Sequence, residues 1–418
     1  MTADTPRPPH DAADSPLWGE RTRRAIETFA MSRERFAPEL IQGLAWVELA
    51  CARANVEMGL LCPVRGQAIE AAARELIHGA HAEQFPLTVW QSASGRQTHA
   101  NVDEVLAQRA ATLLDESAGI VVDISAADDV GLGHDADEAF AAATHVASAL
   151  LVHQRLLPAL ARLRGTLAAK SHFYRDLGRA DGASTRAAAP TLGEALGAFE
   201  TQLSQAQRAI DAARGPVLEL AIGANADDAT RTEFAGRACA FLAEATGHAF
   251  RPAGDRFAAL ASADAMVQLH AALKGLAMAL AQLSDLGAWA GSQLDLDLEA
   301  ADAHDAEAPA CEVQPAMCQA MTMICAQVIG NDAALSAGAA CGALRGHAAR
   351  PLIAHALVQS LLLLSDGIGS FEAHLMRGLA ARPRRERRRV DEGVLLRAAR
   401  PDGVRGAARA DAAFRPQA

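Results

Sequence analysis

Three short stretches of the chain combine side chains that could bind an anion or move a proton. They are Ser94-Gly95-Arg96, the turn His134-Asp135-Ala136-Asp137, and an acidic stretch from His304 to Gln314. A hydroxyl and a guanidinium can bind a carboxylate, and a neighbouring histidine and aspartate can act as an acid–base pair. The second and third stretches carry negative charge, however, and would repel an acidic substrate.

Two of these stretches also allow less specific interpretations. His134 beside Asp135 could form an acid–base pair, but a polar surface loop gives the same pattern. His304, Asp305 and Glu307, followed by Cys311, could hold a metal ion, yet their spacing fits no zinc template. We therefore predict an acidic loop there, and no metal site or cofactor.

The composition narrows the class of protein. The chain has 418 residues, of which 50% are hydrophobic and only 4% aromatic, and it is rich in alanine, which favours helix over sheet. A net charge of −11 argues against a nucleic-acid-binding protein. The basic run Arg382–Arg389 has no interleaved aromatic residues for base stacking, so we interpret it as a solvated helix start.

The sequence also predicts a compartment. Residues 1–16 are polar and proline-rich without a signal-peptide core, and the longest uncharged apolar stretch, near Gly275–Ser284, is too short to span a bilayer. The seven cysteines are odd in number and form no CxxC pair, as is typical of buried thiols in a reducing compartment. We expect a cytoplasmic protein that does not contact a membrane.

Helical periodicity dominates the elements that must position these side chains. It predicts helices over Pro38–Gly59, Val64–Gly79, Leu150–Lys170, Thr191–Arg214, Ser262–Trp289, Val313–Ser336 and Pro351–Phe371. The helix over Ser262–Trp289 would be about 40 Å long, which suits a multi-helix bundle. The helix over Val313–Ser336 is apolar almost all round, which predicts a buried rod at the centre of an all-α fold.

Several stretches resemble one family. Phe85–Ala110, FPLTVWQSASGRQTHANVDEVLAQRA, resembles the block FPLxVWQTGSGTQxNMNxNEVxANRA of class II fumarases and their aspartase relatives. Val313–Ser336 resembles the helix that follows the signature loop of that family, and the resemblance extends from about Leu17 to Phe371. It implies a fumarase/aspartase-like fold with a long central helical bundle. We expect a disordered arm over 1–16, an N-terminal lyase-like domain over 17–124, the bundle over 125–371 and a shortened C-terminal segment over 372–418.

The resemblance also implies an activity and an assembly. Members of the family add groups to, or eliminate them from, a fumarate-type double bond without metal or organic cofactor. They are homotetramers whose sites form where three subunits meet. A protein of this kind would be a carbon–oxygen lyase, a fumarate hydratase of class II type, with a small dicarboxylate as its ligand.

Alignment to the family motifs shows which site residues this chain keeps. Ser94, Gly95 and Asn101 match, whereas Arg96 replaces a threonine and Asp135 and Asp137 replace a serine and an asparagine of the carboxylate clamp. The chain has no histidine between His172 and His248, where the family places one that transfers protons. In the signature loop and the helix after it, the catalytic serine, lysine, asparagine and glutamate are replaced by Ala306, Glu312, Gln314 and Gln319.

Three hypotheses follow from these replacements. The resemblance implies a fumarate hydratase, whereas the replaced residues favour a catalytically impaired paralogue, because no catalytic residue of the family is retained. Such a paralogue could form mixed oligomers with an active fumarase or regulate it. Alternatively, a rebuilt site could use Arg96, His99, His134 and Asp137 on a different substrate.

Overall fold

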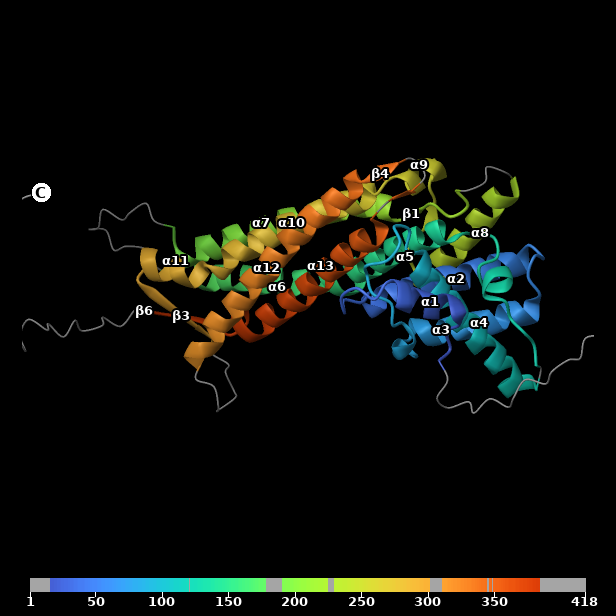
Figure 1. Cartoon of the computed structure of the whole chain (residues 1–418). Helices are drawn as coiled ribbons and strands as arrows, with labels where there is room; N and C mark the ends of the chain where they lie inside the picture. The colour runs from blue at the N-terminus through green and yellow to red at the C-terminus, as the bar shows by residue number, and fades with distance from the viewer. Residues whose placement is uncertain are drawn as a thin grey trace, which may run out of the picture.

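The structure is a computed structural model of the full chain, and it describes residues 16–119, 121–177, 190–224, 229–300, 310–343, 346–347 and 349–383. Figure 1 shows an elongated molecule in which the N-terminal helices gather at one end and long helices extend from them. The prediction of an all-α fold is confirmed, since the described strands form only short two-stranded pairs.

The N-terminal helices form one end of the molecule. They are α1 (Glu20–Thr28), α2 (Pro38–Glu57), α3 (Pro63–Ile77), η1 (Ala82–Gln84), α4 (Arg96–Ala118) and η2 (Ala126–Val130). Helix α2 starts with proline at its first position, where a missing N–H costs nothing, and it buries Leu44 and Val47 completely. Its predicted bounds differ from the observed ones by two residues at the C-terminal end.

Helix α1 depends on a residue far along the chain. Its N-cap, Gly19, provides no side-chain cap. The carboxylate of Glu104 on α4 instead accepts hydrogen bonds from the N–H groups of Gly19, Arg21 and Thr22, at 2.9–3.2 Å, and from the Thr22 hydroxyl at 2.7 Å. A charged acceptor at a helix N-terminus satisfies free N–H groups and opposes the helix dipole.

The remaining elements complete the fold, and the longest of them build its long part. They are α5 (Ala136–Leu151), η3 (Val152–Leu156), α6 (Leu157–Phe173), α7 (Leu192–Val217), β1 (Glu219–Leu220), α8 (Ala229–Thr246), β2 (Arg251–Pro252), α9 (Arg256–Ala261), α10 (Asp264–Ser284), α11 (Leu286–Gln293), β3 (Leu296–Ala300), α12 (Ala310–Ala340), β4 (Gly342–Ala343), β5 (Gly346–His347), α13 (Arg350–Phe371), η4 (Glu372–Met376) and β6 (Leu379–Pro383). Helices α6, α7, α10, α12 and α13 contact one another in that order, and α13 closes the ring on α6. The long bundle predicted from periodicity is therefore present (Figure 1).

Two predictions about secondary structure need correction. The single helix expected over Ser262–Trp289 is divided into α10 and α11 at Asp285. Helix α10 buries a stripe of leucines, of which Leu273 and Leu280 are fully enclosed. The basic run that starts at Arg382, interpreted as a helix start, begins in strand β6 instead. Strand β6 pairs antiparallel with β3, with Leu296 opposite Pro383 and Ala300 opposite Leu379. Most of the basic run Arg382–Arg389 lies outside the described residues.

Helix α12 differs most from its prediction. Within the single chain it packs on α10 and α13, and it buries one face through Met321, Cys325, Val328 and Leu335. On its outer face Met323 and Ile329 are 67% and 42% exposed. The prediction that this helix is buried all round is wrong for one chain, because neighbouring helices cover only part of its circumference.

One helical segment is apolar and long enough to cross a membrane by composition. It runs from Arg350 to Met376, with a mean hydropathy of 1.5 in its most apolar window, and 61% of that window is buried. The stretch singled out in the sequence, near Gly275–Ser284, is therefore not the longest such candidate. A segment buried to this extent has the character of a core helix in a water-soluble fold.

Candidate active site

The turn Ser94-Gly95-Arg96 lies at the start of α4, packed against α5. Gly95 adopts a left-handed conformation with φ of +74°, and a Cβ at this position would overlap the ring of Phe140. Ser94 is half-buried, whereas Arg96, the first residue of α4, is exposed. Glycine is needed here because both the backbone conformation and the close approach of Phe140 exclude a side chain.

Asp135 and Asp137 occupy the start of α5. Asp135 is the N-cap of this helix, and its carboxylate accepts hydrogen bonds from the N–H groups of Asp137 and Glu138 at 3.0 and 3.3 Å. Asp137 is half-buried, and its Oδ1 atom is enclosed without a hydrogen-bond partner in the described part of the chain. The two replaced clamp positions therefore present acceptors where the family motif has donors.

Arg350 is a residue near these positions that the sequence analysis missed. Its N–H donates to the carbonyl of Ala93 at 3.1 Å, and its Nη1 donates to the carbonyl of Asp137 at 3.3 Å. Burial lowers the pKa of Arg350, while Asp137 and Asp135 oppose this shift. This guanidinium offsets part of the negative charge at the turn. The sequence around Arg350 indicates only the start of a helix, and nothing in it shows that this arginine is buried.

Asn101, the third residue that matches the family motif, turns inward. It is 1% exposed, and its Nδ2 donates to the carbonyl of Gln84 at 3.1 Å, while its Oδ1 is buried and meets no hydrogen-bond donor of the described residues. In this chain it fastens the segment before the Ser94 turn to α4.

Beneath the turn lies a buried group that we call the Glu48 cluster, defined as Glu48, His99 and His134. Glu48 comes from α2, His99 from α4, and His134 directly precedes the cap of α5. The Oε1 atom of Glu48 lies 3.0 Å from Nε2 of His99 and 3.1 Å from Nε2 of His134. The three side chains are only 0, 7 and 1% exposed, respectively.

Burial and neighbouring charges shift the pKa values of all three residues of the Glu48 cluster. Burial would raise the pKa of Glu48, but His134 and His99 outweigh it and hold that pKa at about 2. Burial would lower the pKa values of both histidines. Glu48, with Cys51, raises the pKa of His134 well above its usual range, and Asp103 with Glu48 raises that of His99. The geometry and these shifts favour the ionised carboxylate beside charged imidazoles.

The rebuilt-site hypothesis named four residues. The structure brings two of them together, His99 and His134, whose ring centroids are 5.6 Å apart. His134 forms hydrogen bonds with Glu48 and with the carbonyl of Leu132, at 3.1 and 3.3 Å, and also with the Cys51 thiol. The carboxylate of Asp135 caps α5 instead, so these contacts do not form the acid–base pair that we considered between His134 and Asp135. Arg96, by contrast, faces solvent at the start of α4.

The aligned positions of the signature loop and its helix that the structure describes lie at the other end of the bundle. Ala306 and the candidate ligands His304, Asp305 and Glu307 are outside the described residues, whereas Glu312 and Gln314 fall in the first turns of α12 and Gln319 is exposed. Gly338, near the other end of α12, adjoins Ala349 beside the Ser94 turn. The nineteen residues from Gln319 to Gly338 span about 28 Å of helix. Within one chain, these positions cannot meet the Ser94 turn (Figure 1).

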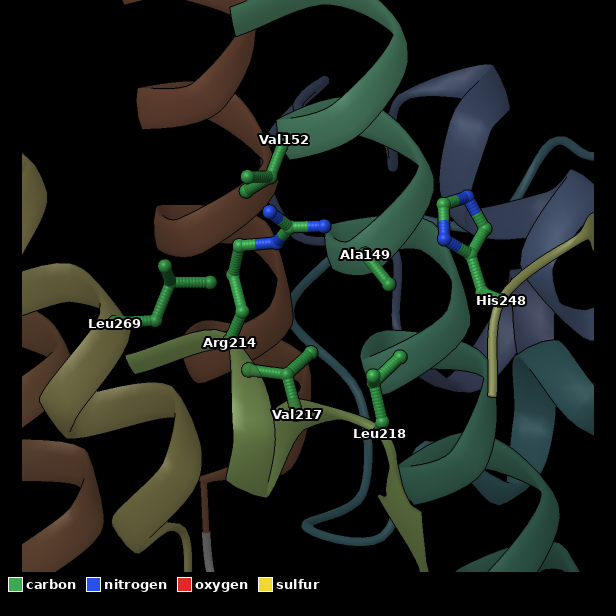
Figure 2. Close-up of a pocket in the computed structure, with 7 residues that line it drawn as sticks. All are labelled: Ala149, Val152, Arg214, Val217, Leu218, His248 and Leu269. Carbon is green, nitrogen blue, oxygen red and sulfur yellow. The ribbon is translucent and has the colours of Figure 1, made fainter. Parts of the chain in front are cut away.

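Three cavities lie elsewhere in the described part of the chain. Figure 2 shows one between α5, α7 and α10, where Arg214 extends beside Val152 and His248 stands apart on the other side of Ala149. Its volume of 10 Å³ has room for about one water molecule. Cavities of 340 and 230 Å³ lie beside Trp46 and beside His355. None of the three is lined by Ser94, Asp135 or Asp137.

Comparison with known proteins identifies the family to which this chain is similar. Residues 9–301 match the family described as Lyase. Fumarate hydratase class II of Chromobacterium violaceum is 39% identical over 382 residues, which cover 89% of this chain and 83% of the relative. The corresponding protein of Myxococcus xanthus is 37% identical over 396 residues, covering 93% and 85%. The crystal structure of class II fumarase from Schistosoma mansoni superposes with a TM-score of 0.78 at 28% identity, covering 87% of this chain and 81% of that one.

Proposed function

This chain belongs to the lyase family that includes the class II fumarate hydratases, and we propose that it is a fumarase-like protein impaired in the hydration of fumarate. The observation that carries this proposal is the pair Asp135 and Asp137 at the carboxylate clamp. By alignment with the family motif, their acidic side chains replace the hydrogen-bond donors that a dicarboxylate needs, and in the structure Asp135 is an acceptor at the start of α5. Like charges oppose binding, and the repulsion is stronger where solvent is partly excluded, as at the half-buried Asp137.

The requirements of the reaction support the same proposal. Hydration of fumarate needs a base, an acid and groups that stabilise charge on the substrate carboxylate. His99 and His134 are the buried histidines below the Ser94 turn, and both are engaged by Glu48. The side chains of His99 and His134 are 7 and 1% exposed, and both nitrogens of each ring already face an acceptor, so neither ring offers a free nitrogen to a substrate. A rebuilt lyase therefore has less support than an impaired one.

We expect purified protein to convert fumarate at a rate several orders of magnitude below that of an active relative, because several members of a catalytic unit are replaced together. The measurement is the loss of fumarate absorbance in the ultraviolet, with the Chromobacterium violaceum relative as the positive control. Turnover within tenfold of that control would contradict the proposal. A thermal-shift screen with malate, aspartate and argininosuccinate tests the rebuilt lyase, since a ligand that binds the folded state raises the melting temperature.

We also propose that the chain assembles into a homotetramer or into a mixed oligomer with an active paralogue. The exposed methionines Met323 on α12 and Met278 on α10 support an interface on the bundle, with exposures of 67% and 52%. Sites shared among subunits would also explain why Gln319 and the Ser94 turn lie at opposite ends of one chain. A cytoplasmic, reducing compartment fits the six described free cysteines, three of which are buried.

Met323→Glu is expected to weaken self-association at least tenfold, because it places a charge on an apolar surface that an interface would desolvate. The measurement is molar mass by light scattering over a dilution series. Val121→Glu is the matched control, since Val121 is 88% exposed and lies outside the bundle. Equal masses for both variants and the unmodified protein would rule out an interface at Met323.

A further inference from the structure

We propose that Glu48, His99 and His134 form a binding site for a divalent transition-metal ion of the Zn²⁺ type. The three side chains come from separate elements and offer one carboxylate oxygen and two imidazole nitrogens, all within 4.8 Å of one another. Two histidines and a glutamate are a ligand set that suits zinc. This inference does not depend on whether hydratase activity is impaired.

The orientation of both imidazoles fits metal ligation. Each ring directs its Nε2 atom towards Oε1 of Glu48, at 3.0 Å for His99 and 3.1 Å for His134. The opposite nitrogen of each ring also faces an acceptor. Nδ1 of His99 lies 3.1 Å from Oδ2 of Asp103, and Nδ1 of His134 lies 3.3 Å from the carbonyl of Leu132. Metal-binding histidines commonly donate their second N–H to a carboxylate or a backbone carbonyl in this way.

The outer contacts are themselves held in place. Asn55 on α2 donates to the same Leu132 carbonyl at 2.7 Å, which fixes the backbone beside His134. Asp103 lies one turn after His99 on α4 and is 4% exposed. Supporting groups of this kind orient the ligands before an ion arrives.

Unused acceptor atoms provide a second, independent observation. Oε2 of Glu48 and Oδ1 of Asp103 are buried without a hydrogen-bond partner among the described residues. A buried carboxylate oxygen without a partner costs free energy, which an ion beside it would offset. Glu48 could then bind through one or both oxygens, and Asp103 adds negative charge behind His99.

The distances between the ligand atoms and the net charge of the Glu48 cluster are also compatible with a bound divalent ion. Four ligands at 2.0–2.1 Å in a tetrahedron lie about 3.3 Å apart, so the distances of 3.0 and 3.1 Å from Oε1 to the two Nε2 atoms need to widen by only a few tenths of an ångström. The ligand atoms of the two imidazoles lie within 4.8 Å of each other and would have to settle at a similar distance around the ion. Without metal, each Nε2 must carry a proton to bond with Oε1. One divalent ion replaces these two protons and leaves the charge of the enclosed site unchanged.

Cobalt provides a direct test, because Co²⁺ replaces Zn²⁺ and absorbs visible light when it is tetrahedral. Full-length protein is stripped with a chelator, titrated with Co²⁺ and desalted. We expect about one ion per chain to remain, with the spectrum of a four-coordinate site. His99→Asn, which introduces the residue of the family motif, and His134→Gln should each lower the affinity at least tenfold.

His81→Asn is the matched control, since His81 contacts Glu75 at 2.9 Å in an ordinary surface pair, and it should bind like the unmodified protein. X-ray absorption on the unmodified metal-bound protein gives a readout independent of any variant that fails to fold. It should show two imidazoles with further oxygen ligands. Failure to retain cobalt, equal retention by the His99 and His134 variants, or coordination without two imidazoles would each overturn the proposal.

Discussion

Replacing Glu48 with alanine is expected to lower the free energy of unfolding by about 3–5 kcal/mol, because it leaves His99 and His134 buried without their shared acceptor. The carboxylate is fully enclosed, so water cannot take its place without a rearrangement of α2 and α4. Urea unfolding followed by circular dichroism measures the change. A chelator in every sample separates this effect from metal binding.

Glu57→Ala is the matched control for that experiment. Glu57 lies on the same helix and pairs with Arg237, but its side chain is 49% exposed, so its loss should cost less than about 1 kcal/mol. Equal effects of the two variants would show that burial of the Glu48 cluster adds nothing to stability. Glu48→Gln should fall between them, because an amide still accepts a hydrogen bond but carries no charge.

Gly95→Ala is expected to cost about 2–5 kcal/mol, the sum of about 1–2 for a left-handed backbone and about 1–3 for overpacking. The added methyl group would overlap the ring of Phe140, which is completely buried and cannot move aside freely. The same urea titration measures the loss. Because the turn also carries Ser94 and Arg96, this variant should disturb the candidate site as well as the fold.

Gly59→Ala separates the two contributions. Gly59 has a similar φ of +70°, and nothing lies within 4 Å of a Cβ built there, so only the backbone cost of about 1–2 kcal/mol remains. The excess loss in Gly95→Ala then reports the contact with Phe140. If the two glycine variants lose the same stability, the close packing of the Ser94 turn against α5 is refuted.

Much of the fold could be predicted from the sequence because a long helix with one buried face repeats its apolar residues every three to four positions. The leucine stripe of α10 and the proline starts of α2 and α13 were readable residue by residue. The division at Asp285 was not, since one turn of irregular backbone hardly disturbs a helical pattern. Apolar residues on all sides of α12 indicated complete burial, but a sequence does not say whether the cover comes from the same chain.

The candidate site was only partly predictable for a different reason. Ser94, Asp135 and Asp137 could be found through motif alignment, and these residues do lie at neighbouring helix starts. Glu48 was hidden within the apolar pattern of α2, and its partners are 51 and 86 residues away. One signal was available: a glutamate between Val47 and Leu49 on a buried helix needs a charged partner.

The capping of α1 by Glu104 has a consequence for how the chain folds as it is synthesised. The four donors at the start of α1 find their acceptor 82–85 residues later, on α4. A nine-residue helix without a local cap has little stability of its own in water. On the ribosome, α1 must therefore remain unformed until α4 has emerged, so the first helix in the sequence is completed only after a later one.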